Sequence, residues 1–115
     1  MSGPVQFRDI ALPSGGVARL SGDKLMVYEA LEVCLRRSRD ATMHEVFEVL
    51  SAQLGREVQA NRYSGRFSGL CEMGVLERCP DKRDDATTLR NRANHGRAPR
   101  VYCWRLPVMQ QRLVA

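Results

Sequence analysis

The segment that decides the fold spans residues 60–73 and reads ANRYSGRFSGLCEM. Its apolar residues recur at steps of four, three and one, which places them on one face of a helix: Tyr63, Phe67, Leu70 and Cys71. The opposite face carries short polar side chains, a guanidinium group and glycine. Gly65 and Gly69 each cost a helix about 1 kcal/mol relative to alanine, but they permit another molecule to approach the backbone closely. We therefore predict a helix with one side in the core and the other open to a partner.

Two further helices are predicted before this segment. From Gly22 onward, apolar residues recur at steps of three and four, and the cations of residues 36–37 suit the negative end of a helix that finishes there. A second helix begins at Thr42, because Thr42 and Glu45 have the spacing of a capping box. Gly55 directly follows Leu54, at a position where a left-handed residue commonly closes a helix.

Two strands are predicted after the third helix. Gly74 ends that helix, and residues 75–79 (VLERC) form the first strand. Residues 100–106 (RVYCWRL) are rich in β-branched and aromatic types and form the second strand. We expect Tyr102 and Trp104 to share one face of it, with Trp104 in the core. The polar residues 80–99 are expected to form a long basic hairpin loop.

The length of 115 residues allows one compact domain with one core. Residues 1–21 show no sustained periodicity, and we predict an N-terminal arm with a short extended piece around Val17–Leu20. Residues 22–106 then form the domain, and residues 107–115 form a C-terminal tail. The expected fold class is α+β, with a three-helix core and a β wing of two or three strands.

At this point the sequence resembles a known family. NRYSGRFSGL (61–70) followed by MGVLER (73–78) looks like the recognition helix and next strand of small bacterial and phage winged helix-turn-helix proteins. GRAPRVYCWRL (96–106) is similar to the exit of the wing in phage-borne members. Gly69 departs from the family pattern, in which Glu is common. The resemblance covers about residues 22–106 and implies DNA binding, with the third helix in the major groove and the wing on the backbone or in the minor groove.

The distribution of charge agrees with an anionic partner. The net charge is +5, yet residues 23–54 carry four basic and six acidic side chains, whereas residues 55–106 carry eleven basic and six acidic ones. Residues 86–100 contain four arginines and no acid. A positive field on one part of a small domain is what a polyanion requires. Taken alone, such a run is usually only a solvated surface.

The candidate DNA-binding residues follow from the family resemblance and from the basic charge of residues 55–106. Asn pairs with adenine and Arg with guanine through two hydrogen bonds, and Arg66, near the edge of the face, suits a phosphate. The alternatives are that Asn61 caps the helix, that Arg62 and Arg66 are merely solvated, and that the wing loop is a solvated tether. The expected contacts are Gln59, Asn61, Arg62, Ser64, Gly65, Arg66 and Ser68 on the third helix, and Arg90, Arg92, Arg97 and Arg100 in the wing.

No metal, cofactor or catalytic site is expected. The four cysteines stand at positions 34, 71, 79 and 103, without the close pairs that zinc requires, and His44 and His95 are not spaced to complete a site. We predict reduced thiols that are mostly buried. The sequence Ser14-Gly15-Gly16 lacks the Lys and the following helix of a nucleotide-binding loop. No nucleophile with an adjacent base is evident, so we predict a protein that is not an enzyme.

The function expected from the sequence is sequence-specific binding to double-stranded DNA, as a transcriptional regulator or as a DNA-binding protein of a phage or mobile element. No apolar run approaches the roughly 20 residues of a membrane span, and we expect the bacterial cytoplasm or nucleoid. One recognition helix gives limited affinity, so a homodimer through residues 1–21 and 107–115 is expected. The alternative is a winged-helix protein–protein module that docks through the acidic face of the first two helices.

Overall fold

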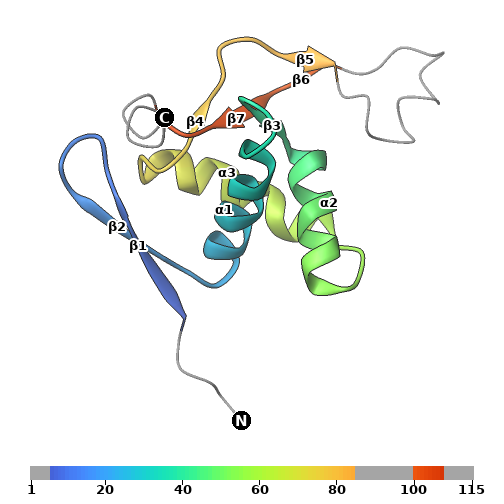
Figure 1. The fold of residues 1–115 in the computed structure, drawn as a ribbon, viewed down its shortest axis with the longest axis horizontal. Helices are drawn as coiled ribbons and strands as arrows, with labels where there is room; N and C mark the ends of the chain where they lie inside the picture. Colours follow the sequence, from blue (N-terminus) through green and yellow to red (C-terminus); the bar gives the residue numbers. More distant parts are fainter. Residues whose placement is uncertain (1–5, 85–99, 108–115) are drawn as a thin grey trace.

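The computed structural model describes residues 6–84 and 100–107, and it confirms the α+β class (Figure 1). The described residues form three helices: α1 (Gly22–Leu35), α2 (Met43–Leu54) and α3 (Ala60–Glu72). They also form short antiparallel strands: β1 (Phe7–Ala11), β2 (Val17–Ser21), β3 (Ala41–Thr42), β4 (Glu77–Arg78), β5 (Arg83–Asp84), β6 (Arg100–Val101) and β7 (Cys103–Arg105).

The predicted limits of α2 are confirmed in atomic detail. The Glu45 backbone N–H donates to Thr42 Oγ1 at 3.2 Å, and the Thr42 N–H donates to Glu45 Oε1 at 2.8 Å, which completes the capping box. Gly55 follows Leu54 with φ of 70°, the left-handed conformation that glycine adopts without strain. Both ends of this helix are therefore set by local sequence.

The apolar face of α3 packs into the centre of the molecule. Tyr63, Phe67 and Leu70 are buried as predicted, whereas Cys71 is only half-buried. The Phe67 ring lies 5.9 Å from the ring of Phe47 in α2 and 5.1 Å from that of Trp104 in β7, centroid to centroid. These aromatic contacts fix α3 against α2 and the sheet at once.

The sheet behind the helices has the strand order β3-β7-β4. Ala41 pairs with Trp104 and Glu77 with Arg105, so β7 is the central strand. Farther along, β5 pairs with β6 and extends the hairpin away from the helices (Figure 1). The predicted first strand, residues 75–79, is reduced to Glu77–Arg78.

The predicted second strand is interrupted at Tyr102. The expectation that Tyr102 and Trp104 lie on the same face of one strand is wrong, because only Trp104 of the two is buried. Trp104 is buried as predicted, but Tyr102 is 43% exposed. Cys103 and Trp104, which are adjacent in sequence, are both buried. The reason is that the chain pairs with β5 at β6 and then changes partner to β3 and β4 at β7, which breaks the alternation of a continuous strand.

The N-terminal segment differs from the arm that we predicted. The extended piece at Val17–Leu20 is present as β2, but it pairs with β1 in a hairpin that packs on α1. The side chains on the inner face of this hairpin belong to the same core as the helices: Ile10, Ala18 and Leu20. The packed unit therefore begins before Gly22.

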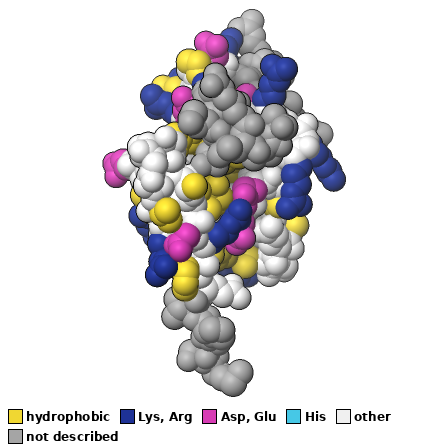
Figure 2. All heavy atoms as spheres, turned by 60° about the vertical axis from the view of Figure 1, so that its left-hand side comes forward, with side chains coloured by type: hydrophobic (Ala, Val, Ile, Leu, Met, Phe, Trp, Pro, Cys, Tyr) yellow, Lys and Arg dark blue, Asp and Glu magenta, His cyan; other side chains and the backbone are white. Residues whose placement is uncertain are grey.

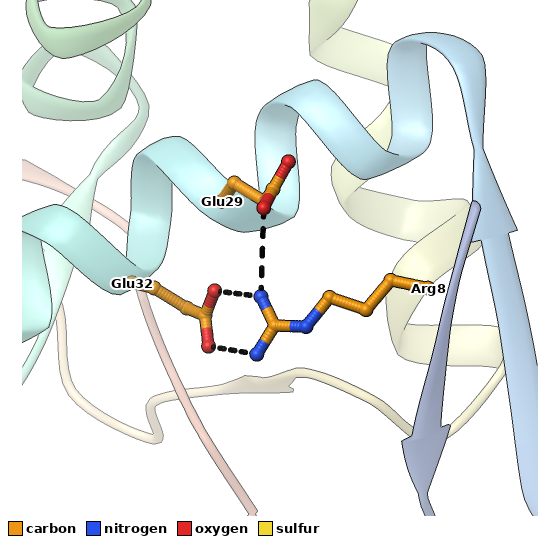
Figure 3. Close-up of polar contacts among 3 residues, drawn as sticks. All are labelled: Arg8, Glu29 and Glu32. Atoms are coloured by element: carbon orange, nitrogen blue, oxygen red, sulfur yellow. Dashed lines mark hydrogen bonds and ion pairs between the residues drawn. The ribbon is translucent and has the colours of Figure 1, made fainter. Parts of the chain in front are cut away.

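One ion-pair cluster joins this hairpin to α1 (Figure 3). The Arg8 guanidinium lies between the carboxylates of Glu29 and Glu32, and it stands 3.6 Å from Glu29 Oε2. The hydrogen bonding that Arg8 donates to the Glu32 carboxylate is the main reason that the pKa of Arg8 is raised. Two acids of the α1 face are thus paired within the chain.

The hairpin provides a test of where the domain begins. Leu20 is fully buried, whereas Val17 on the same strand is 66% exposed. Leu20→Ala should therefore lower the free energy of unfolding by about 2–5 kcal/mol, and Val17→Ala should change it by no more than about 0.5 kcal/mol. Urea denaturation measures both. Equal, small effects would show that the hairpin is a dispensable arm.

Candidate nucleic-acid interface

The outer face of α3 is open to solvent along its length. Of the residues predicted to contact DNA, Ser64 is half-buried and the others on this helix are exposed: Gln59, Asn61, Arg62, Gly65, Arg66 and Ser68. The N-cap is Gln59 rather than Asn61, and within the described residues its side chain makes no capping hydrogen bond. Asn61 is therefore not the helix cap, and its amide lies on the exposed face.

Helical geometry divides this face into two edges. Arg62, Arg66 and Gly69 follow one another at steps of four and three, on the edge that faces α1. Ser64, Ser68 and Cys71 form the other edge in the same way. Cys71 interacts with Arg78 of β4, so this second edge faces the β hairpin. The exposed face of α3 thus lies between the start of α1 and the base of the hairpin.

The two arginines on the α1 edge share one carboxylate. Arg62 Nε lies 3.3 Å from Asp23 Oδ2, and Arg62 Nη2 lies 3.3 Å from Asp23 Oδ1. Arg66 Nη2 stands 3.7 Å from the same Oδ2 atom. The hydrogen bond to Asp23 is the largest cause of the raised pKa of Arg62. Neither arginine is simply solvated.

Gly69 lies beneath a side chain of α1. The Lys24 side chain crosses α3 at this point, with Nζ 3.7 Å from Met73 Sδ. A Cβ atom at position 69 would lie 3.3 Å from Lys24 Cε, which is tighter than an ordinary contact. Glycine therefore leaves room for the lysine stem to pass over the helix.

The second β hairpin, which runs through β4, β5, β6 and β7, carries a cluster of cations around one exposed ring at its base. Arg78 Cζ lies 4.3 Å from the centroid of the Tyr102 ring, and Lys82 Nζ lies 4.5 Å from it. Arg100 Nη2 donates to the Lys82 carbonyl at 2.9 Å, which holds a third cation beside them. Of the four wing arginines that we predicted, only Arg100 is described; Arg90, Arg92 and Arg97 lie outside the described residues.

Of this cluster, the sequence predicted only Arg100, and it did not predict a role for Asp23. Arg78 pairs with Trp104 across the sheet, so it lies near Tyr102, two residues away on the opposing strand. An aromatic residue opposite basic residues in a predicted hairpin is the signal that was available. For Asp23 no local signal exists, because it is 39 residues from Arg62.

The other groups give no second chemistry in the described part of the chain. None of the four cysteines, all of which lie in the described residues, forms a disulfide: Cys79 and Cys103 are buried, as predicted, and Cys34 and Cys71 are half-buried. Burial raises the pKa of the Cys71 and Cys79 thiols, which makes them poor nucleophiles. Among residues 6–84 and 100–107, no group of three His, Cys, Asp or Glu residues could hold a metal ion. No helix of the described segments is long and apolar enough to cross a membrane.

A groove lies beside α1 and α2. Its volume is about 660 Å³, and its lining combines four charged residues, Gln53 and apolar side chains that include Leu106; the charged residues are Arg8, Glu29, Glu32 and Arg36. Figure 2, which brings the β1–β2 side forward, shows acidic, basic and hydrophobic side chains interspersed on the part of this face that the structure describes. The described residues there therefore mix charges of both signs.

Comparison with protein-family models, with curated proteins and with solved structures found no match to this chain.

The two glycines of α3 give a test of this geometry. Among the described atoms nothing lies within 4 Å of a Cβ added at Gly65, so Gly65→Ala should raise the free energy of unfolding by about 0.5–1 kcal/mol. Gly69→Ala should gain less, because its Cβ presses on Lys24. In a Lys24→Ala background the two gains should become equal. Chemical denaturation measures them, and a full gain for Gly69→Ala with Lys24 present would contradict the contact.

Proposed function

We propose that this protein is a winged helix-turn-helix protein that binds double-stranded DNA sequence-specifically, with α3 in the major groove. The exposed polar face of α3 is the observation that carries this proposal. Arg78 of β4, which interacts with Cys71 at one edge of that face and stacks on Tyr102, adds a cation on the hairpin side. The element order α1-β3-α2-α3-β4-β7, with the sheet order β3-β7-β4, is compatible with a winged-helix layout and supports the same proposal. We assign it the role of a transcriptional regulator or of a phage or mobile-element DNA-binding protein, without catalysis.

The residue types on α3 suit the reading of bases. Asn61 can donate one hydrogen bond to N7 of adenine and accept one from its N6 amino group, and Arg62 can donate two to guanine. Ser64 and Ser68 offer hydroxyl groups to either base edges or phosphates. Gly65 lies on the same exposed face and has no side chain, so the helix backbone can come close to the duplex.

The surrounding cations suit the phosphates. Arg66 lies at the α1 edge of the face, and Arg78, Lys82 and Arg100 lie on the hairpin side. Cations on both sides of a helix can contact the two backbones that flank a major groove, and such contacts fix the register of the protein on DNA. Tyr102 keeps Arg78 and Lys82 together, because each cation is attracted to the face of its ring.

The alternative function, a winged-helix protein–protein module, is supported by the groove of about 660 Å³ beside α1 and α2. The acidic residues expected to attract a basic partner there include Glu29 and Glu32, and Arg8 already pairs both. That pairing reduces the negative field of the groove, so we place this function second. A homodimer remains a proposal, and residues 1–5 and 108–115 of the expected contact segments lie outside the described residues.

The DNA proposal makes a quantitative prediction about salt. If about four cations contact phosphates, the slope of log K against log salt for a random-sequence duplex should be about −4. The double variant Arg62→Ala plus Arg66→Ala should bind at least about tenfold more weakly at low salt and not measurably at moderate salt. Fluorescence anisotropy with a labelled duplex measures both quantities.

The matched control removes two exposed arginines elsewhere. Arg19 lies on β2 and Arg37 follows α1, so Arg19→Ala plus Arg37→Ala makes the same change in net charge away from α3. Its affinity should stay within about twofold of wild type. Absence of duplex binding by the wild-type protein at low salt would refute DNA binding and favour the protein-partner function.

A further inference from the structure

Asp23 occupies an unusual position for an acid in a protein proposed to bind DNA. It lies in the first turn of α1, next to the exposed face of α3, and its carboxylate contacts both Arg62 and Arg66. Its side chain is only 21% exposed, whereas those of Arg62 and Arg66 are 54% and 44% exposed. The two guanidinium groups therefore cover the acid and present their remaining N–H groups outward.

This arrangement acts on Arg62 through geometry. The two hydrogen bonds from Nε and Nη2 to the two carboxylate oxygens fix the plane of the guanidinium group. A long side chain that is already held in one orientation loses less conformational freedom when it binds a base edge. The Tyr63 ring, with its centroid 5.3 Å from Arg62 Cζ, supports the same orientation.

The same arrangement acts through charge. Asp23, Arg62 and Arg66 together carry a net charge of +1, although two arginines stand at the surface. A phosphate that approaches either arginine must compete with Asp23 for its donors and is repelled by the carboxylate. This repulsion acts on every duplex, because every duplex has phosphates, whereas the oriented guanidinium favours only a duplex with a suitable base edge.

From these contacts we infer that Asp23 is a positioning residue that sets the selectivity of the α3 face, by orienting Arg62 and by weakening the attraction of both arginines for random duplex. The inference rests on the proposed DNA binding and deepens it. Asp23 itself does not contact a base. It acts through the two arginines, at the cost of a lower affinity for DNA in general.

The test compares three variants on two probes. Asp23→Asn removes the charge and keeps the size, and Asp23→Glu keeps the charge. Asp9→Asn is the matched control, since Asp9 forms an exposed pair with Arg19 at 2.8 Å and its loss changes the net charge equally. The probes are a random-sequence duplex and a pool of duplexes recovered by repeated selection with the wild-type protein.

Asp23→Asn should bind the random duplex about threefold to tenfold more tightly and should steepen the salt slope by about one. Its affinity for the selected pool should not increase, so the ratio of the two affinities should fall by about threefold or more. Asp9→Asn and Asp23→Glu should each keep that ratio within about twofold of wild type. Unchanged or weaker binding of Asp23→Asn to random duplex would overturn the inference, as would an equal effect of Asp9→Asn.

A second measurement needs no DNA and distinguishes a local change at Arg62 from a loss of folding. In the free protein, the Arg62 Nε–H group should exchange with water several-fold faster in Asp23→Asn than in wild type, while the amide spectrum of the core is preserved. Equal exchange would overturn the orienting role of Asp23. Failure of the wild-type protein to bind any duplex would instead contradict the proposed function itself, and the selectivity role would fall with it.

Discussion

The contact of Phe67 with Phe47 and Trp104 is the interaction on which the rest of this structure depends. Phe67 comes from α3, Phe47 from α2 and Trp104 from β7, and the three rings meet at centroid distances of 5.9 and 5.1 Å from Phe67. One side chain thereby sets the position of α3 relative to both a helix and the sheet. Because the apolar side of α3 is fixed inward, its polar side has only one direction in which to point.

The features that sequence alone could predict are those that local chemistry determines. Thr42 and Glu45 form a capping box within four residues of each other, and Gly55 ends the same helix in a left-handed conformation. The inward face of α3 follows from the spacing of Tyr63, Phe67 and Leu70. The exposure of Asn61 and Arg62 is the other half of that pattern.

The features that sequence could not predict depend on distant contacts. The inner residues Ile10, Ala18 and Leu20 are few and are separated by a turn, so the hairpin β1–β2 has no strong periodic signal before it meets α1. The interruption at Tyr102 results from a change of pairing partner rather than from the strand's own residues. Asp23 and Lys24 reach α3 only because α1 and α3 pack together. The acid that faces the proposed interface is therefore visible only in the folded chain.

The position of Trp104 has a consequence for the shape of any partner. Trp104 pairs with Arg78 on one side of its strand and contacts Phe67, so Arg78 and the polar side of α3 are connected through the packed core. The distance between Arg78 and the polar face of α3 is then fixed when the protein folds and does not depend on binding a partner. A DNA duplex whose groove spacing does not match that distance would have to bend to contact both surfaces. The sequence-dependent stiffness of the duplex would then contribute to recognition.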